Sequence, residues 1–345
     1  MANQDAVKAG TLSIHFKLVL VQLFWAGTFV ASEIALITQP PALTALVRFI
    51  LTTSGYILLC ISMPSNFSDS LWVRCRQVSL LQWIALTMMG VFCVTVYTLL
   101  LHLGLESSTA AYAALLIPTT QPIFTAILSR VILKGALTAS LIAGLALGFV
   151  GATLIVVEGF QDSNEKLLLG NLTIILAALS FSVYAVSARF APPILSSTET
   201  TTISFLIGTL ALCPMPFFFS ESYALTDVTW SFWLSIAYLV IFATILPYLW
   251  WNQAVKEIGS TQTGVYTFLM PPLAIILAMI ILNHQPSIIE IFGGLLAMSG
   301  VALATLGIPD WLKRFGFNRP VPAGLPNDNK MSANIATPLQ SKTGE

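Results

Sequence analysis

Ten apolar stretches, each about 20 residues long, follow one another along the chain and constrain its fold more than any other feature, because a helix of that length crosses a bilayer. They lie at residues 18–37, 42–62, 80–101, 107–129, 136–157, 168–188, 199–219, 230–252, 261–282 and 287–307. Charged residues make up only 9% of the chain, whereas a soluble domain carries about 25%. The sequence therefore predicts an all-α integral membrane protein with ten transmembrane helices.

The basic residues are distributed as this layout requires. Ten spans place both ends of the chain on the same side of the membrane, and cytoplasmic loops carry an excess of Lys and Arg. If the ends are cytoplasmic, only Arg48 and Lys166 of the 15 basic residues lie towards the other side. We therefore expect both termini in the cytoplasm, and we expect a bacterial inner membrane.

The chain contains an internal repeat. Residues 121–154 align with residues 270–303 at an offset of 149. The matched pairs are Pro122 with Pro271, Gly144 with Gly293, and Gly151 with Gly300. Each repeat holds five of the ten expected helices, and because five is odd, the second copy enters the membrane from the opposite side. Such inverted repeats are typical of secondary transporters, in which one half moves against the other around a central site.

This repeat defines the expected organisation of the chain. Residues 309–345 carry five prolines among polar residues, a composition that cannot bury a core. The predicted parts are a cytoplasmic N-terminal tail at 1–15, a first repeat at 16–157, an extracytoplasmic loop at 158–167, a second repeat at 168–308, and a disordered cytoplasmic tail at 309–345. Residues 62–79 mix aromatic and basic side chains, which suits a short segment along the cytoplasmic interface.

Several segments resemble a known family. They are FWAGTFVAS followed by PPALTALVRF, LGLESSTAAYAALLIPTTQPIFTAIL, and WNQAVKEIGSTQTGVYTFLMPPLAIILA in the second repeat. They are similar to the EamA-type branch of the drug/metabolite transporter superfamily over roughly residues 15–307. The resemblance implies ten helices in two inverted halves around a central cavity, with export or exchange of amino acids or other small metabolites. It also supports an arginine at position 48.

Prolines inside the spans predict where a substrate binds. Pro118 and Pro122 are expected to interrupt the fourth helix, and Pro271 with Pro272 to interrupt the ninth at the matching place. A proline leaves a backbone carbonyl without its helical partner, and matched breaks in two halves mark a substrate site. The residues at this repeat position, Gln121 and Met270, are therefore candidates for the cavity.

Aromatic residues within the spans are further candidates, because their rings suit an amphipathic or aromatic solute and can hold a cation. By the repeat register, Phe181 takes the place in the second half that Trp25 takes in the first. Trp250 and Trp251 lie near a span end, where interfacial anchoring is expected. The aromatic candidates for the cavity are Trp25, Tyr97, Phe181, Tyr184 and Tyr266.

Few ionisable groups lie within the spans, where such groups are costly and functional by default. Glu33 and Arg48 both fall near the outer edge and could form an ion pair or a coupling site. Arg48 could instead bind an anionic group of a substrate, or extend to the interface. Glu290 follows Ser287 in a capping-box pattern, and Glu199 follows Ser196 in another. Caps explain these two acids without a transport role.

The sequence favours no other class of function. Every aspartate lies outside the spans, which argues against aspartyl intramembrane proteases. No cofactor, metal site, ATP-binding loop or nucleic-acid partner is indicated. The expected partners are a small-molecule substrate and the lipid bilayer, and a homodimer is left open. We predict a permease, not an enzyme, that exports an amino acid or related amphipathic compound by alternating access. A channel, a scramblase or a membrane-embedded sensor on the same fold is the alternative.

Overall fold

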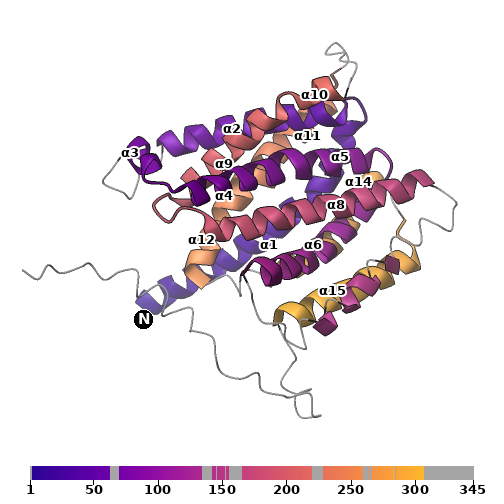
Figure 1. Cartoon of the computed structure of the whole chain (residues 1–345). Helices are drawn as coiled ribbons and strands as arrows, with labels where there is room; N and C mark the ends of the chain where they lie inside the picture. Colours follow the sequence, from indigo (N-terminus) through magenta and orange to yellow (C-terminus); the bar gives the residue numbers. More distant parts are fainter. Residues whose placement is uncertain are drawn as a thin grey trace, which may run out of the picture. The chain divides into compact units, whose positions relative to one another are not determined.

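The computed structural model describes residues 2–62, 70–133, 142–144, 146–151, 153–154, 165–219, 228–258, 263, 266–283 and 285–306. All regular structure in these ranges is helical (Figure 1). Seven helical segments are long and apolar enough to cross a membrane, at 13–36, 41–62, 80–105, 110–129, 165–190, 197–218 and 230–254. The prediction of an all-α protein with several membrane spans is confirmed for the described residues.

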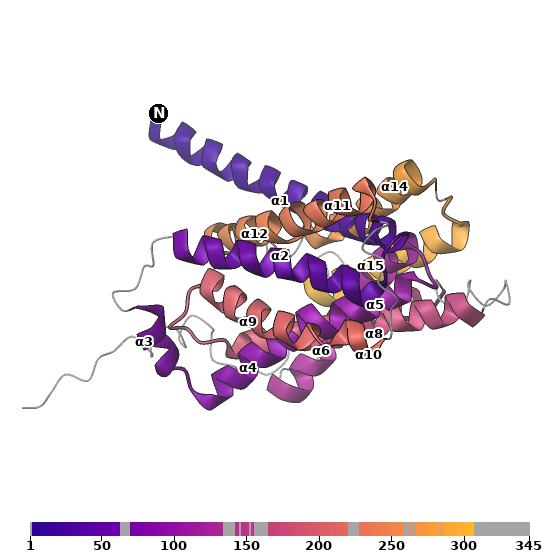
Figure 2. The same ribbon diagram turned by 90° about the horizontal axis from the view of Figure 1, so that it is seen from above.

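The first half of the chain supplies these elements: α1 (Ala2–Leu36), α2 (Pro41–Ser62), α3 (Leu71–Arg76), α4 (Leu80–Gly90), the π-helical η1 (Val91–Val96), α5 (Tyr97–Leu105) and α6 (Ala110–Leu133). The second half supplies α8 (Glu165–Ser187), η2 (Ala188–Phe190), α9 (Ser197–Leu212), α10 (Met215–Phe218), α11 (Trp230–Ala237), the π-helical η4 (Tyr238–Ile245), α12 (Leu246–Ile258), η5 (Tyr266–Leu269), α14 (Met270–Leu282) and α15 (Ile288–Leu306). Helices from the two halves lie side by side, as α6 does with α8 and α2 with α9 (Figure 2).

The seven long segments coincide with seven of the ten expected spans. The other three correspond to shorter apolar helices at 142–151, 272–282 and 288–300, and parts of those expected spans lie outside the described residues. Helix α1 already begins at Ala2, so the residues expected as an N-terminal tail continue the first helix. The expected C-terminal tail and most of the loop at 158–167 lie outside the described residues.

Small residues bring helices of the two halves together, as their spacing predicts. A Cβ atom added to Gly300 would lie 2.3 Å from the backbone nitrogen of Gly148, and one added to Gly151 would lie 2.5 Å from that of Ala297. The largest apolar core is built in the same way, since the alanine-rich start of α6 packs against α1, α8 and α14. Close backbone approach is thus the means by which this chain packs its halves.

Both predicted capping boxes are confirmed. The Ser196 side chain accepts from the backbone N–H of Glu199 at 3.2 Å, and the Glu199 carboxylate accepts from the N–H of Ser196 at 2.8 Å. Ser287 and Glu290 make the same pair of bonds at α15, at 3.0 and 3.1 Å. These bonds occupy backbone donors that have no partner inside the helix.

The prediction that prolines interrupt the fourth helix is wrong, because α6 continues through Pro118 and Pro122. Threonine hydroxyls also bond to the backbone of this stretch, since Thr119 donates to the carbonyl of Leu115 and Thr120 to that of Leu116, both at 2.6 Å. Apolar surroundings leave the helical backbone as the best partner for its own polar groups. In the second half, a change from 3₁₀ to α-helix does occur at the matching place, and Pro271 and Pro272 lie in the first turn of α14.

The matched irregularities that the structure does contain are π-helical. At the repeat offset of 149, η1 corresponds to residues 240–245, which belong to η4. Their widened turns offer backbone carbonyls to side-chain hydroxyls. Ser180 donates to the carbonyl of Phe92 at 2.7 Å, and Thr244 donates to that of Leu239 at 2.8 Å. These bonds matter because bilayer carbonyls need partners, and such π segments frequently occur at functional sites.

Candidate functional site

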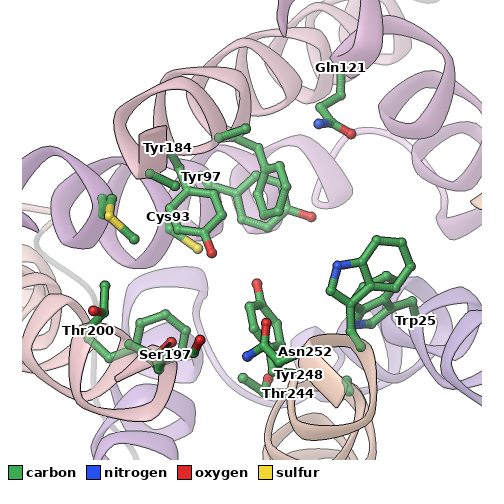
Figure 3. A pocket seen from close by; sticks show the side chains of 18 of the residues that line it. Trp25, Cys93, Tyr97, Gln121, Tyr184, Ser197, Thr200, Thr244, Tyr248 and Asn252 are labelled. Carbon is green, nitrogen blue, oxygen red and sulfur yellow. Dashed lines mark hydrogen bonds between the residues drawn. The ribbon is translucent and has the colours of Figure 1, made fainter. Parts of the chain in front are cut away.

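A cavity of about 710 Å³ lies between the helices of the two halves. This volume falls within the range of about 300–1,000 Å³ typical of sites for small organic ligands. Figure 3 shows Tyr97 and Tyr184 on one side of the cavity and Thr244, Tyr248 and Asn252 on the opposite side. Its wall is therefore shared between the two repeats.

Most of the residues predicted from the sequence lie on this wall. The predicted residues among its lining are Trp25, Arg48, Tyr97, Gln121, Phe181, Tyr184, Met270, Pro118 and Pro122. Tyr266 is placed elsewhere, because its hydroxyl lies 2.6 Å from Nδ1 of His15 and its ring stacks on that imidazole. The predicted cavity role of Tyr266 is therefore replaced by a contact with His15 of α1.

Arg48 is the one charged side chain among the described residues that line the cavity. It is only 6% exposed, and its Nη2 donates to the hydroxyl of Thr244 at 3.3 Å. Its Nε and Nη1 have no hydrogen-bond partner within the described structure, and its guanidinium carbon lies 5.1 Å from the ring centre of Phe49. A buried cation with two unoccupied donor nitrogens has the chemistry to accept an anionic group as a partner.

Glu33 and Arg48 have different partners. The Glu33 carboxylate accepts a hydrogen bond from the backbone N–H of Ala110, at the start of α6. A carboxylate is favourable there because a helix N-terminus carries unpaired N–H groups and partial positive charge. His102, in the last turn of α5, is fully buried, and its Nδ1 lies 3.2 Å from the carbonyl oxygen of Pro41.

The aromatic side chains form two groups on the cavity wall. Phe181 lies between Tyr97 and Tyr184, with ring centres 5.2 and 5.1 Å apart. The Trp25 ring lies 5.1 Å from that of Trp251. Trp251 was expected as an interfacial anchor, but it lines the cavity instead, because 3.6 residues per turn bring it to the same face of α12 as Tyr248.

Sequence reasoning missed several polar residues of the wall. They come mainly from the third span of each half and from α9, and they are Cys93, Ser197, Thr200, Thr201, Thr244, Tyr248 and Asn252. Spacing was the available signal, since Thr244, Tyr248 and Asn252 follow one another at intervals of four and share one helix face. Cys93 lies on this wall as a buried thiol. The described residues contain no group of three or more side chains that could hold a metal ion.

A buried ion pair joins the two halves beside the cavity. Arg74, in α3, donates from Nη1 and Nη2 to the two carboxylate oxygens of Glu199 at 2.7 and 2.5 Å. Its Nη1 also donates to the carbonyl of Ile194 at 3.0 Å. The hydrogen bonds to Glu199 raise the pKa of Arg74 above its ordinary value. Because Ser197 and Thr200 line the cavity, this pair holds one part of the wall in place.

Comparison with known proteins identifies the family. The sequence profile of the EamA-like transporter family matches the chain twice, at residues 12–157 and 168–306. The uncharacterized transporter YyaM of Bacillus subtilis is 26% identical over 85% of this chain and 94% of its own length. A probable terminal-alkyne amino-acid exporter of Streptantibioticus cattleyicolor is 27% identical over 83% of this chain and 91% of that protein.

Two further comparisons extend this result. A probable amino-acid metabolite efflux pump of Escherichia coli is 23% identical, over 89% of this chain and 97% of the pump. A solved crystal structure matches with a TM-score of 0.57 at 22% identity, covering 88% of this chain and 98% of that one, which shows the fold. The chain therefore belongs to the EamA-like transporter family, and it is a multi-pass integral membrane transporter.

Proposed function

We propose that this transporter exports a small amphipathic metabolite that carries a carboxylate, such as an amino acid or a related compound. The observation that carries the proposal is Arg48, a buried cation with two unoccupied donor nitrogens on the wall of an aromatic cavity. A guanidinium binds a carboxylate through two parallel hydrogen bonds, and Nη2 keeps one N–H besides the one donated to Thr244, so it can form such a pair together with Nε or Nη1. The rings of Trp25, Tyr97 and Phe181 offer apolar surface to the rest of such a molecule.

The names of two relatives agree with this substrate class. The Streptantibioticus protein is described as an amino-acid exporter and the Escherichia coli protein as an amino-acid metabolite efflux pump. Both match most of this chain. The relatives therefore support outward movement of amino-acid-like solutes, while the chemistry of Arg48 supports the carboxylate.

The proposed mechanism is alternating access between two inverted five-helix repeats, with ten membrane helices and both termini in the cytoplasm. Helices of both halves line the cavity, so movement of one half against the other would open it to one side and then to the other. Reporter fusions at the two chain ends test this topology. Ends found on opposite faces of the bacterial inner membrane would rule out five helices in each half.

Counterflow in proteoliposomes tests transport itself. Saturable exchange of a labelled amino acid across a sealed bilayer is the expected result, and Arg48→Ala should abolish it while leaving expression and folding intact. Arg76→Ala is the matched control, because Arg76 is exposed and stacks on the Trp72 ring, 5.0 Å from its centre and outside the cavity. Conductance without saturation would favour a channel, and equal flux in the two variants would remove Arg48 from the substrate site.

A further inference from the structure

We propose that the cargo crosses the membrane as a net anion and that Arg48 selects it by its charge. The inference rests on the proposed transport function and adds the charge class of the substrate. Within the described part of the chain, the Arg48 guanidinium donates a single hydrogen bond, of 3.3 Å, to the neutral hydroxyl of Thr244. That long bond leaves Nε and Nη1 without partners at a site 6% exposed. Because burying an unpaired charge is costly, an entering anion relieves a cost that a neutral molecule does not.

The remaining lining residues offer this cation no counter-charge. Among those that the structure describes, the polar ones other than Arg48 carry hydroxyl, thiol or amide groups, as Tyr248, Cys93 and Asn252 do. These groups can donate hydrogen bonds to a carboxylate as well as accept them from a neutral N–H. One carboxylate therefore makes the described site electrically neutral.

A zwitterion would fit this wall less well than an anion. Its ammonium group would have aromatic faces and hydroxyl oxygens as partners, which hold a cation more weakly than a carboxylate does. A carboxylic acid whose nitrogen is acylated, or which has no amine, carries only the negative charge of its carboxylate, which neutralises Arg48. The preferred class is thus an amphipathic monocarboxylate, such as an N-acylated amino acid or an aryl carboxylic acid.

This charge class gives export a source of energy. With one anion bound the cavity is neutral, and after release it regains the positive charge of Arg48, so each export cycle moves one negative charge outwards. A membrane potential that is negative inside favours that movement. At 100 mV the potential supports a concentration ratio of about 50-fold for one charge. Export then needs no coupling ion.

Three derivatives of one side chain test the selection directly. N-acetyl-L-phenylalanine is an anion, L-phenylalanine a zwitterion and L-phenylalanine amide a cation, and all three carry the same ring. The purified protein is reconstituted into proteoliposomes, and the vesicles are loaded with labelled probe. Counterflow is measured first without a membrane potential. We expect the anion to compete with the labelled probe at a concentration at least tenfold lower than the zwitterion needs, and we expect the cation to compete least of all. A potassium gradient with valinomycin then imposes 100 mV, and the anion should distribute towards the positive side by up to about 50-fold.

The outcomes separate the two proposals. Counterflow of L-phenylalanine with no preference for the acetylated probe and no response to potential would overturn net-anion selection but keep the transporter. No counterflow of any probe would overturn both. Arg48→Lys, which keeps the charge, should keep the order of the three probes at lower affinity, whereas Arg48→Gln should lose it. The potential-dependent distribution is measured on the unmodified protein, so it decides the question even if a variant fails to fold.

Discussion

Replacing Glu199 by Gln should destabilise the protein by about 3–5 kcal/mol, the cost of removing one partner from a buried ion pair. The change is nearly isosteric, and a glutamine three residues after Ser196 still satisfies the capping box. What it removes is charge from two short bonds, of 2.7 and 2.5 Å, to Arg74. Because Arg74 is 2% exposed, water cannot replace the lost carboxylate without opening the structure.

The magnitude is best measured by a double-mutant cycle. Equilibrium unfolding by SDS titration in mixed micelles would be followed for Glu199→Gln, Arg74→Met and the double variant. Because the double variant buries no unpaired charge, its loss should fall short of the sum of the single losses by about 2–3 kcal/mol. Additive losses would show that the two side chains do not stabilise each other, and the argument from their geometry would fail.

Glu290→Gln is the matched control, because Glu290 makes the same capping box at α15. Loss of charge at a helix N-terminus should cost about 1 kcal/mol there. If Glu199→Gln and Glu290→Gln unfold at the same SDS fraction, the effect at α9 belongs to the cap and not to the ion pair with Arg74.

Two further predictions follow from packing. In Gly90→Ala the new Cβ would lie 2.1 Å from the carbonyl oxygen of Ser204, about 1 Å inside the ordinary C···O distance of about 3.3 Å, so α4 and α9 must separate and the yield of monodisperse protein in size-exclusion chromatography should fall. The control Gly55→Ala meets only a flexible side-chain end at 2.6 Å and should keep its yield. Equal yields of the two variants would contradict the predicted clash at Gly90. Ser108→Ala removes the 2.6 Å bond donated to Oδ1 of Asn171 and should cost about 1–3 kcal/mol in the same SDS titration, whereas an unchanged midpoint would show that this contact between the halves contributes nothing.

The features predicted correctly from the sequence are those set by local pattern. Span positions follow from runs of apolar residues, and capping boxes such as Ser287 with Glu290 follow from a spacing of three. The close packing of Gly300 against Gly148 follows from small residues one helical turn apart. Most candidate cavity residues were found because a polar side chain inside a bilayer span is costly and therefore usually faces the interior of the helix bundle.

The features that were missed depend on contacts between distant parts of the chain. Arg74 was expected at the cytoplasmic interface, and nothing near it in sequence indicates a partner 125 residues away. The same holds for Tyr266, whose partner His15 is 251 residues distant. Unbroken passage of α6 through Pro118 and Pro122 was missed because proline is a helix breaker in water, whereas an apolar environment favours continued helix.

The wide turn in the third span has a consequence for what a solute meets as it moves. Met89, Cys93 and Tyr97 all line the cavity, although in a regular α-helix each step of four residues drifts about 40° around the axis. The π segment that contains Cys93 needs more residues per revolution, which cancels much of this drift. The three side chains can therefore point in the same direction along a line parallel to the helix axis, so that a molecule in the cavity can pass from one to the next without rotating.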